Sequence, residues 1–280
     1  MSVVMLAAAR SLLFAPGDDP RKLRKAAEAG AHGVIADLED GVSAPEREAA
    51  RAHIQSVFGE LGGEVLRSVR INPPGTSDHE RDLELVRSLP EAILVLPKAT
   101  PGAVESLAGV EPILAIVETA AGLDAAHELA SHPAVVALAL GNLDLSADLG
   151  LRPRSDGLEL LMPRTALVLA SALAGIRPPF DGVNPDFRDE NSLRDAVDLA
   201  ASLGLRGKLC IHPAQVAPVN EGFLPSQAER AWARAVLDEC EAARRAGRAV
   251  AALDGAMIDA PVVARARALL EGEGAEVATR

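Results

Sequence analysis

Short runs of β-prone residues alternate with helical segments along most of the chain. About eight such runs recur, and several are continuous stretches of Val, Ile, Leu and Ala rather than strict alternations of apolar and polar residues. Continuous apolar runs of this length are typical of parallel strands that are covered on both faces. The predicted strands are 12–15, 33–38, 65–71, 92–96, 113–117, 135–140, a weaker one near 177–180, and 208–211.

The segments between the strands carry helix start and stop signals. Pro20 stands near the first position of one helix, and Gly30 is placed to end it. Ser43 and Glu46 have the spacing of a capping box. Strands that alternate with helices over a length near the ~250 residues typical of the fold predict a closed (β/α)8 TIM barrel. A doubly wound open sheet is the alternative, although the sequence APGD after the first strand is not the glycine-rich phosphate fingerprint of that fold.

The C-terminal part of the chain is longer than a barrel requires. One long helix is expected from Pro225 to Arg245 and another from Pro261 to Glu271, with the glycine-containing stretch 255–261 between them. We therefore predict a catalytic barrel over residues 1–224. Residues 225–280 are expected to form a helical extension that serves as an arm, a lid or an oligomer contact.

Charge and composition narrow the classes of partner. The 280 residues include 40 acidic and 28 basic side chains, for a formal net charge of −12. Such a charge repels phosphate groups, so we expect no binding to nucleic acid or to anionic membranes. No apolar run approaches the ~20 residues of a transmembrane helix. The apolar start lacks the basic segment of a signal peptide, and two cysteines cannot form a disulfide framework. These features predict a cytoplasmic protein.

Charged residues follow most of the predicted strands. The active site of a barrel lies at the carboxyl ends of its strands, so these residues are expected to converge. Glu118 and Asp144 follow neighbouring strands. One or two carboxylates, completed by water and substrate, are the ligands that Mg²⁺ prefers. Each carboxylate alone is explained equally well as a first-turn acid of the helix that follows it.

Arg70 ends an apolar strand, where a buried guanidinium needs a partner. A carboxylate that accepts two hydrogen bonds is the natural one, and the sequence offers Asp37, Glu39 or Asp40, or else an acidic group of a substrate. These three carboxylates lie within four residues, a crowding that requires a nearby cation or a raised pKa. His212, after the last strand, is more often a helix cap than a base.

Several of these stretches together resemble the citrate lyase beta subunit family, which has malyl-CoA and citramalyl-CoA lyases as close relatives. The matching stretches follow in order from Arg10 to about Ser226, and their combination is highly specific for the family. They are RSLLFAPG at 10–17, DLEDGV at 37–42, VRIN at 69–72, LPK at 96–98, VET at 117–119, GNLDLSADLG at 141–150 and GKLCIHPAQ at 207–215.

The resemblance implies a Mg²⁺-dependent carbon–carbon lyase on a (β/α)8 barrel, usually a homotrimer or hexamer. By position, Glu118 and Asp144 match the metal ligands, and Glu118 also faces the substrate. Arg70 matches the residue that grips the carboxylate of the oxo-acid. Asp37 and Asp40 match catalytic acids near the water molecules of the metal.

The resemblance also implies a coenzyme A thioester as substrate or carrier. Arg21 and Lys25 match a basic region that relatives use towards the phosphates of coenzyme A, although a basic first helix is also an ordinary solvated face. The stretch LDGAMIDAP at 253–261 resembles a lid motif, in which Asp259 matches an acid/base offered to the site of a neighbouring subunit. Relatives usually carry lysine where this chain has Ala256. Asp259 is also placed to cap the helix that follows.

The family reading predicts cleavage of a citryl thioester to oxaloacetate and an acetyl thioester. Two other classes stay open. The first is a stand-alone malyl-CoA or citramalyl-CoA lyase, or a pyruvate-type aldolase, with the same metal site. The second is a non-catalytic subunit that binds an oxo-acid without turnover. Assembly with other citrate lyase subunits is allowed by the resemblance.

Overall fold

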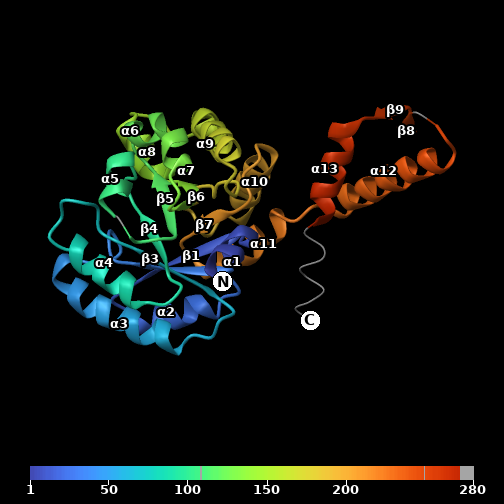
Figure 1. Ribbon diagram of the computed structural model, residues 1–280. Coiled ribbons are helices and arrows are strands. Elements are labelled where there is room, and N and C mark those ends of the chain that lie inside the picture. Colours follow the sequence, from blue (N-terminus) through green and yellow to red (C-terminus); the bar gives the residue numbers. More distant parts are fainter. Residues whose placement is uncertain (108, 249, 272–280) are drawn as a thin grey trace. The chain divides into compact units, whose positions relative to one another are not determined.

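A curled parallel sheet is the framework of the first part of the chain (Figure 1). The computed structural model describes residues 1–107, 109–248 and 250–271, and the chain divides into two units, Met1–Phe223 and Leu224–Arg280. Within the described part of the first unit, seven parallel strands follow the order β6-β5-β4-β3-β2-β1-β7. They are β1 Ser11–Pro16, β2 Gly33–Asp37, β3 Leu66–Arg70, β4 Ile93–Leu96, β5 Ile113–Val117, β6 Val135–Leu140 and β7 Lys208–Cys210.

Both faces of the sheet are buried, as the continuous apolar runs predicted. Successive side chains of a strand point to opposite faces. Leu12 and Ile35 therefore join an inner cluster, whereas Leu13 and Val34 pack in the layer between the sheet and its helices. The helices are α1 Ser2–Ala8, α2 Pro20–Ala27, α3 Arg47–Glu60, α4 His79–Ser88, α5 Pro101–Ser106, α6 Ala120–Asp124, α7 Ala126–Ser131, α8 Asn142–Asp148, α9 Leu161–Ala174, α10 Glu190–Ser202 and α11 Val216–Gly222.

The strand predicted near 177–180 is reduced to two isolated bridges, one from Phe180 to β6 and one from Asp181 to β7. Phe180 exchanges hydrogen bonds of 3.0 Å with the backbone of β6. The backbone N–H of Asp181 donates to Gly207 at 2.7 Å, and its carbonyl accepts from Leu209 in β7 at 2.9 Å. A longer strand does not form here because the two prolines at 178–179 have no N–H to donate to a ladder.

Two of the helix signals act differently from the prediction. The side chain of Asp19 caps α2 by accepting from the backbone of Arg21 and Lys22, and α2 already ends at Ala27, before Gly30. The capping box expected at Ser43 is wrong, since Ser43 makes no side-chain cap and the residues after it form a short 3-10 helix, η1 Ala44–Glu46. The other 3-10 helices are η2 Leu158–Leu160 and η3 Pro213–Gln215.

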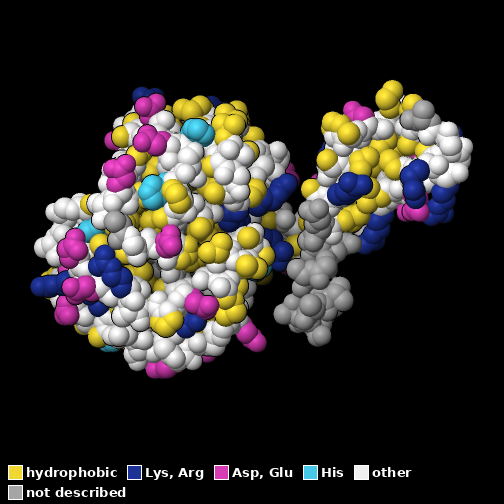
Figure 2. All heavy atoms as spheres, viewed as in Figure 1, with side chains coloured by type: hydrophobic (Ala, Val, Ile, Leu, Met, Phe, Trp, Pro, Cys, Tyr) yellow, Lys and Arg dark blue, Asp and Glu magenta, His cyan; other side chains and the backbone are white. Residues whose placement is uncertain are grey.

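The second unit contains two helices, α12 Gln227–Arg245 and α13 Ala260–Glu271, as the sequence predicted. Between them lies an antiparallel hairpin that the sequence did not predict, β8 Ala251–Leu253 and β9 Ala256–Ile258, and its second strand falls within the expected linker 255–261. Hydrophobic side chains gather between the two helices (Figure 2). Residues 272–280 of the predicted extension lie outside the described residues.

Helix α9 presents large hydrophobic side chains to solvent (Figure 2). Met162, Leu169 and Leu173 are each more than 60% exposed, and their spacing of seven and four residues places them on one side of the helix. Among the described residues, no helix combines the length and the apolar character needed to cross a membrane.

Candidate active site

The loop that follows β2 holds Arg70 through its first carboxylate. Asp37 is buried, and its two oxygens accept from the backbone N–H groups of Glu39 at 3.0 Å and Gly41 at 2.8 Å. The same two oxygens accept from Nε and Nη2 of Arg70 at 2.7 and 2.6 Å. The guanidinium also lies over the ring of Phe14, 4.9 Å from its centroid. Asp37 is therefore the bidentate partner among the candidates that the sequence offered.

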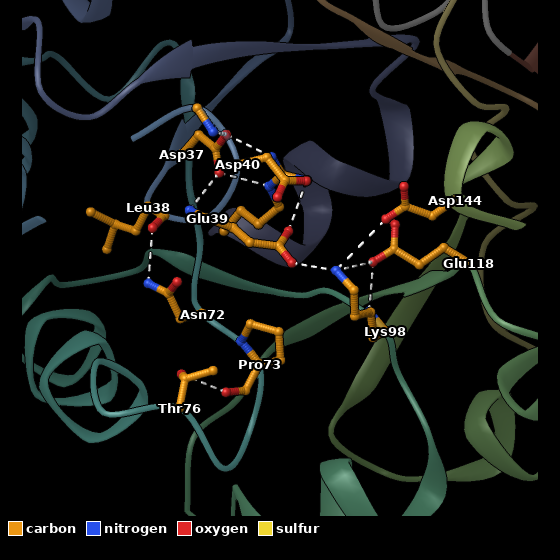
Figure 3. Close-up of polar contacts among 12 residues, drawn as sticks. Asp37, Leu38, Glu39, Asp40, Asn72, Pro73, Thr76, Lys98, Glu118 and Asp144 are labelled. Atoms are coloured by element: carbon orange, nitrogen blue, oxygen red, sulfur yellow. Dashed lines mark hydrogen bonds and ion pairs between the residues drawn. The ribbon is translucent and has the colours of Figure 1, made fainter. Parts of the chain in front are cut away.

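Glu39 joins Arg70 to a second cation. One of its oxygens lies 3.0 Å from Nη1 of Arg70, and the other accepts from Nζ of Lys98 at 2.6 Å (Figure 3). Burial raises the pKa of Glu39 above its ordinary value, although Arg70 and Lys98 oppose that effect. Burial alone would lower the pKa of Arg70, but the hydrogen bonds and charge of Asp37, together with Glu39, raise it instead. Arg70 thus stays charged at any physiological pH.

Lys98 connects the β2 loop to the two predicted metal ligands. It follows β4 with φ of +48°, a left-handed conformation, and its backbone N–H donates to Oε1 of Glu118 at 2.7 Å. Its ammonium lies 4.0 Å from that oxygen and 3.7 Å from Oδ2 of Asp144 (Figure 3). In the sequence, Lys98 follows the predicted strand 92–96 and ends the LPK stretch of the family resemblance, and neither feature predicts these contacts. A left-handed lysine cannot be recognised from pattern alone.

Glu118 is buried at the end of β5, and Asp144 lies half exposed in the first turn of α8. Burial raises the pKa of Glu118 to about 7, opposed by the Lys98 N–H and reinforced by the charges of Glu39 and Asp144. Close approach of the next strand end depends on Gly141, because a Cβ at this position would collide with Glu118. Gly141 is a site residue that sequence reasoning did not single out.

These side chains border a cavity of about 350 Å³ at the carboxyl ends of the strands. Arg70, Glu118 and Asp144 line it together with apolar residues of β1, β5, β6 and β7. A larger crevice of about 960 Å³ lies beside α8, α9 and α10 and shares Asn142, Leu143 and Val183 with the first cavity. Arg70, Glu118 and Asp144 border only the smaller cavity, so we take that one as the candidate site.

The donor set suits a hard divalent cation. Glu118 and Asp144 offer carboxylate oxygens, whereas the described residues hold no group of three or more His, Cys, Asp or Glu placed to bind a metal. Mg²⁺ is commonly held by one or two carboxylates with water and substrate oxygens completing its shell. The raised pKa of Glu118 also fits a position that gains from a nearby cation.

The other predicted residues of the first unit lie outside this cluster or at its edge. The side chain of Asp40 is 69% exposed and lies 3.8 Å from Arg70. Arg21 and Lys25 are exposed on α2. Asp259, in the second unit, accepts from the backbone N–H of Val262 at 3.1 Å and so caps α13.

His212 also takes the structural role that the sequence favoured. Its ring accepts from the backbone of Ala214, and with Gln215 it forms a capping box at the start of η3. The ring stacks on Phe187 with centroids 4.3 Å apart.

Known proteins resemble this chain in sequence and in fold. A family model described as HpcH/HpaI aldolase/citrate lyase matches residues 10–213. The chain belongs to this family. A crystal structure of protein CitE from Mycobacterium tuberculosis, in complex with magnesium, acetoacetate and coenzyme A, is 36% identical with a TM-score of 0.83, over 96% of this chain and 99% of that one.

Two further relatives bear on the reaction. A structure described as the citrate lyase beta subunit from M. tuberculosis, complexed with oxaloacetate and magnesium, is 36% identical with a TM-score of 0.71, over 79% of this chain and 99% of that one. A (3S)-malyl-CoA thioesterase from Cereibacter sphaeroides (strain ATCC 17029) is 35% identical over 266 residues, 93% of each chain.

Proposed function

We propose that this protein is a Mg²⁺-dependent carbon–carbon lyase that cleaves a citryl thioester to oxaloacetate and an acetyl thioester. The observation that carries the proposal is the pair Glu118 and Asp144, which face the same 350 Å³ cavity as Arg70. Relatives crystallised with magnesium, coenzyme A and oxaloacetate support it. Glu118 and Asp144 would hold the metal, which when bound supplies Lewis-acid polarisation of the substrate's hydroxyl and forming carbonyl.

Arg70 binds the carboxylate of the oxo-acid in this proposal. Asp37 accepts from Nε and Nη2 of Arg70, Glu39 lies 3.0 Å from Nη1, and the guanidinium lies over the ring of Phe14. These contacts fix the direction of its remaining N–H groups. A guanidinium held in this way recognises a carboxylate by geometry as well as charge. Asp37 therefore orients Arg70, and Asp40 contributes negative charge at the mouth of the cavity.

The cleavage requires one base and one proton donor. The substrate hydroxyl gives up its proton, the bond to the acetyl carbon breaks, and its electron pair passes to the thioester as an enolate, which then takes up a proton. We assign proton transfer to Asp259 of a neighbouring subunit, with residues 225–280 as the arm that carries it. Arg21 and Lys25 are the residues assigned to the phosphates of coenzyme A.

The fold proposed for this reaction is a closed eight-stranded barrel in a homotrimer or hexamer. Residues 180–181 would stand as the eighth strand, since they hydrogen-bond to both β6 and β7. The exposed hydrophobic side of α9 supports the oligomer, because contiguous exposed apolar patches mark interaction sites. Light scattering with Leu169→Glu and Leu173→Glu tests this assignment, which predicts a smaller assembly for the double variant.

A side-by-side assay decides between the candidate reactions. Citryl-CoA, malyl-CoA and citramalyl-CoA are incubated with the enzyme and Mg²⁺, and acetyl-CoA, free thiol and acids are quantified. We expect acetyl-CoA and oxaloacetate from citryl-CoA, and loss of both products with Glu118→Ala. Acetyl-CoA formed from malyl-CoA or citramalyl-CoA alone would make this a stand-alone lyase. Binding of oxaloacetate without turnover of any thioester would make it a non-catalytic subunit.

Thioester hydrolysis is a second candidate, because the C. sphaeroides relative is described as a (3S)-malyl-CoA thioesterase. Hydrolysis releases free thiol and the intact hydroxy acid, whereas carbon–carbon cleavage leaves the thioester on the acetyl product. The ratio of free thiol to acetyl-CoA from malyl-CoA therefore separates the two.

Asp259 is tested by subunit mixing. Asp259→Ala and Glu118→Ala subunits are combined under conditions that allow exchange. If the site is shared between chains, some mixed sites regain both residues and activity returns. No recovery in oligomers shown to be mixed, or full activity of Asp259→Ala by itself, would leave Asp259 as the cap of α13.

A further inference from the structure

A buried chain of hydrogen bonds runs behind the site, from α3 and α4 to the loop that follows β2. Asp82 in α4 is fully buried, and its Oδ1 accepts from Nε of Arg51 in α3 at 2.8 Å. Its Oδ2 accepts from both the backbone N–H and the side-chain amide of Asn72, at 2.8 and 2.7 Å. The amide of Asn72 also donates to the carbonyl of Leu38 at 2.9 Å (Figure 3). Asp82 thus reaches the β2 loop through one intermediate side chain.

Leu38 is the point where this chain of hydrogen bonds meets the site. Its carbonyl accepts from Asn72, and its backbone N–H donates to the carbonyl of Arg70 at 3.0 Å. The next residue is Glu39, whose carboxylate contacts both Arg70 and Lys98. A displaced Leu38 would therefore move the carboxylates that direct Arg70, which lines the cavity, and Lys98, which lies beside Glu118 and Asp144.

Packing alone does not explain why the buried residue 82 is an aspartate. Burying a carboxylate is costly unless its oxygens are hydrogen-bonded, and an apolar residue in α4 would fill the same space without that cost. Asp82 does not border the cavity, so it has no direct contact with a ligand there. What the carboxylate adds is an acceptor for the buried Arg51 and a fixed position for Asn72.

We propose that Asp82 is a positioning residue of the site: through Asn72 it fixes the 37–41 loop, and through that loop the directions of Arg70 and Lys98. The consequence for substrate binding rests on the proposed function. The consequence for the loop does not, because it follows from hydrogen bonds within the chain.

Asp78 provides a matched control. It pairs with Arg47 at 2.9 Å and with Arg51, so Asp78→Asn removes a carboxylate from the same group of charges. It makes no recorded contact with Asn72 or the β2 loop within the described residues. Asp82→Asn instead replaces one acceptor oxygen with an NH2 group. Whichever oxygen is replaced, the NH2 group faces a donor, either Nε of Arg51 or the N–H groups of Asn72.

Hydrogen exchange and ligand binding test the proposal together. We expect Asp82→Asn to speed amide exchange of residues 38–41 and to weaken Mg²⁺-dependent oxaloacetate binding, each by about tenfold, the low end of losses seen when partners behind metal-site ligands are removed. Asp78→Asn should leave both unchanged. Equal effects of the two variants, or unchanged exchange at 38–41 in Asp82→Asn, would overturn the proposal.

Asn72→Ala is the second variant, in case Asp82→Asn does not fold. It removes the bond to Leu38 but keeps the backbone N–H that donates to Asp82. The same acceleration of exchange at 38–41 is expected, and its absence would contradict the proposal. If wild-type protein binds no oxaloacetate, the proposed function fails, while the exchange measurement still decides the role of Asp82.

Discussion

Two clusters of buried charged side chains in the first unit both combine carboxylates with arginine and lysine, but they shift the pKa of a buried carboxyl in opposite directions. In one, a single carboxylate, Asp181, accepts from Lys208 at 2.6 Å and from Arg164 at 2.8 Å, and none of the three side chains is more than 6% exposed. In the other, at the cavity, five carboxylates surround Arg70 and Lys98.

The balance of charge separates a structural cluster from a functional one. Burial would raise the pKa of Asp181, but its two cations hold that pKa below its ordinary value. Glu118 is also buried, and here burial raises the pKa to about 7, because Lys98 does not offset it and the charges of Glu39 and Asp144 add to it. A surplus of negative charge at a cavity is stable only where an added cation or proton offsets it. Burial together with that surplus distinguishes the candidate ligand site from the Asp181 cluster.

The largest effect is expected from removing the carboxylate of the structural cluster. Asp181→Asn leaves Lys208 and Arg164 buried without their anion, and breaking such a group costs about 3–5 kcal/mol. Urea unfolding should show this loss, while Mg²⁺ affinity of the folded fraction stays unchanged. Asp156→Asn, which removes the exposed partner of Arg154, is the control and should change neither quantity. Weaker Mg²⁺ binding in Asp181→Asn would contradict a purely structural role for the Asp181 cluster.

Removing a carboxylate of the site should have the reverse pattern. Glu118→Ala and Asp144→Ala each take away a proposed metal ligand, and loss of one strong electrostatic contact of this kind costs about 10²–10³-fold. Calorimetry should therefore show the loss of Mg²⁺-dependent oxaloacetate binding in both variants, with the folded state retained. Unchanged binding in both variants would remove them from the metal site.

Arg70→Lys tests whether Arg70 binds the ligand in addition to pairing with Asp37. Lysine keeps the charge but loses the planar fork, and a hydrogen bond between charged groups contributes about 1.5–3 kcal/mol, so oxaloacetate affinity should fall about 10–100-fold. The variant should still fold, because an ammonium can pair with Asp37. Unfolding of the variant, or normal oxaloacetate binding, would give Arg70 a structural role only.

The contrast between the clusters also explains what the sequence could predict. The sequence predicts that Glu118, Asp144 and Arg70 lie together because they stand at the carboxyl ends of predicted strands, and the resemblance supplies their proposed roles. The Asp181 cluster was not predicted, because two prolines interrupt the strand pattern beside it and only isolated bridges form at Phe180 and Asp181. The contacts of Lys98 depend on its left-handed backbone, and the role of Gly141 depends on its close approach to Glu118. Neither feature produces a periodic pattern in the sequence.

The smallest expected effect on ligand binding is the dependence of Mg²⁺ affinity on pH. A carboxyl with a pKa of about 7 is mostly protonated at pH 6 and mostly ionised at pH 8. Because the metal needs the ionised form, Mg²⁺ affinity should fall about tenfold from pH 8 to pH 6, following the protonation of one group. Asp144→Asn retains Glu118 but removes one of the charges that raise its pKa, so its weaker binding should still depend on pH, with the midpoint moved to lower pH. A flat profile between pH 6 and 8 would show that Glu118 is not the group that titrates.

The same group makes an opposite prediction for stability without metal. Since the pKa of Glu118 is raised in the folded protein, the folded state binds the extra proton, and the associated stability is fully present below about pH 4.5 and lost as pH rises through 7. Glu118→Gln keeps a neutral side chain of the same shape. It should therefore match wild type near pH 5 and exceed it at pH 8 by up to about 3 kcal/mol, the equivalent of the shift. Equal urea midpoints of the two proteins at both pH values would mean that Glu118 carries no surplus charge, and the comparison between the two clusters would lose its basis.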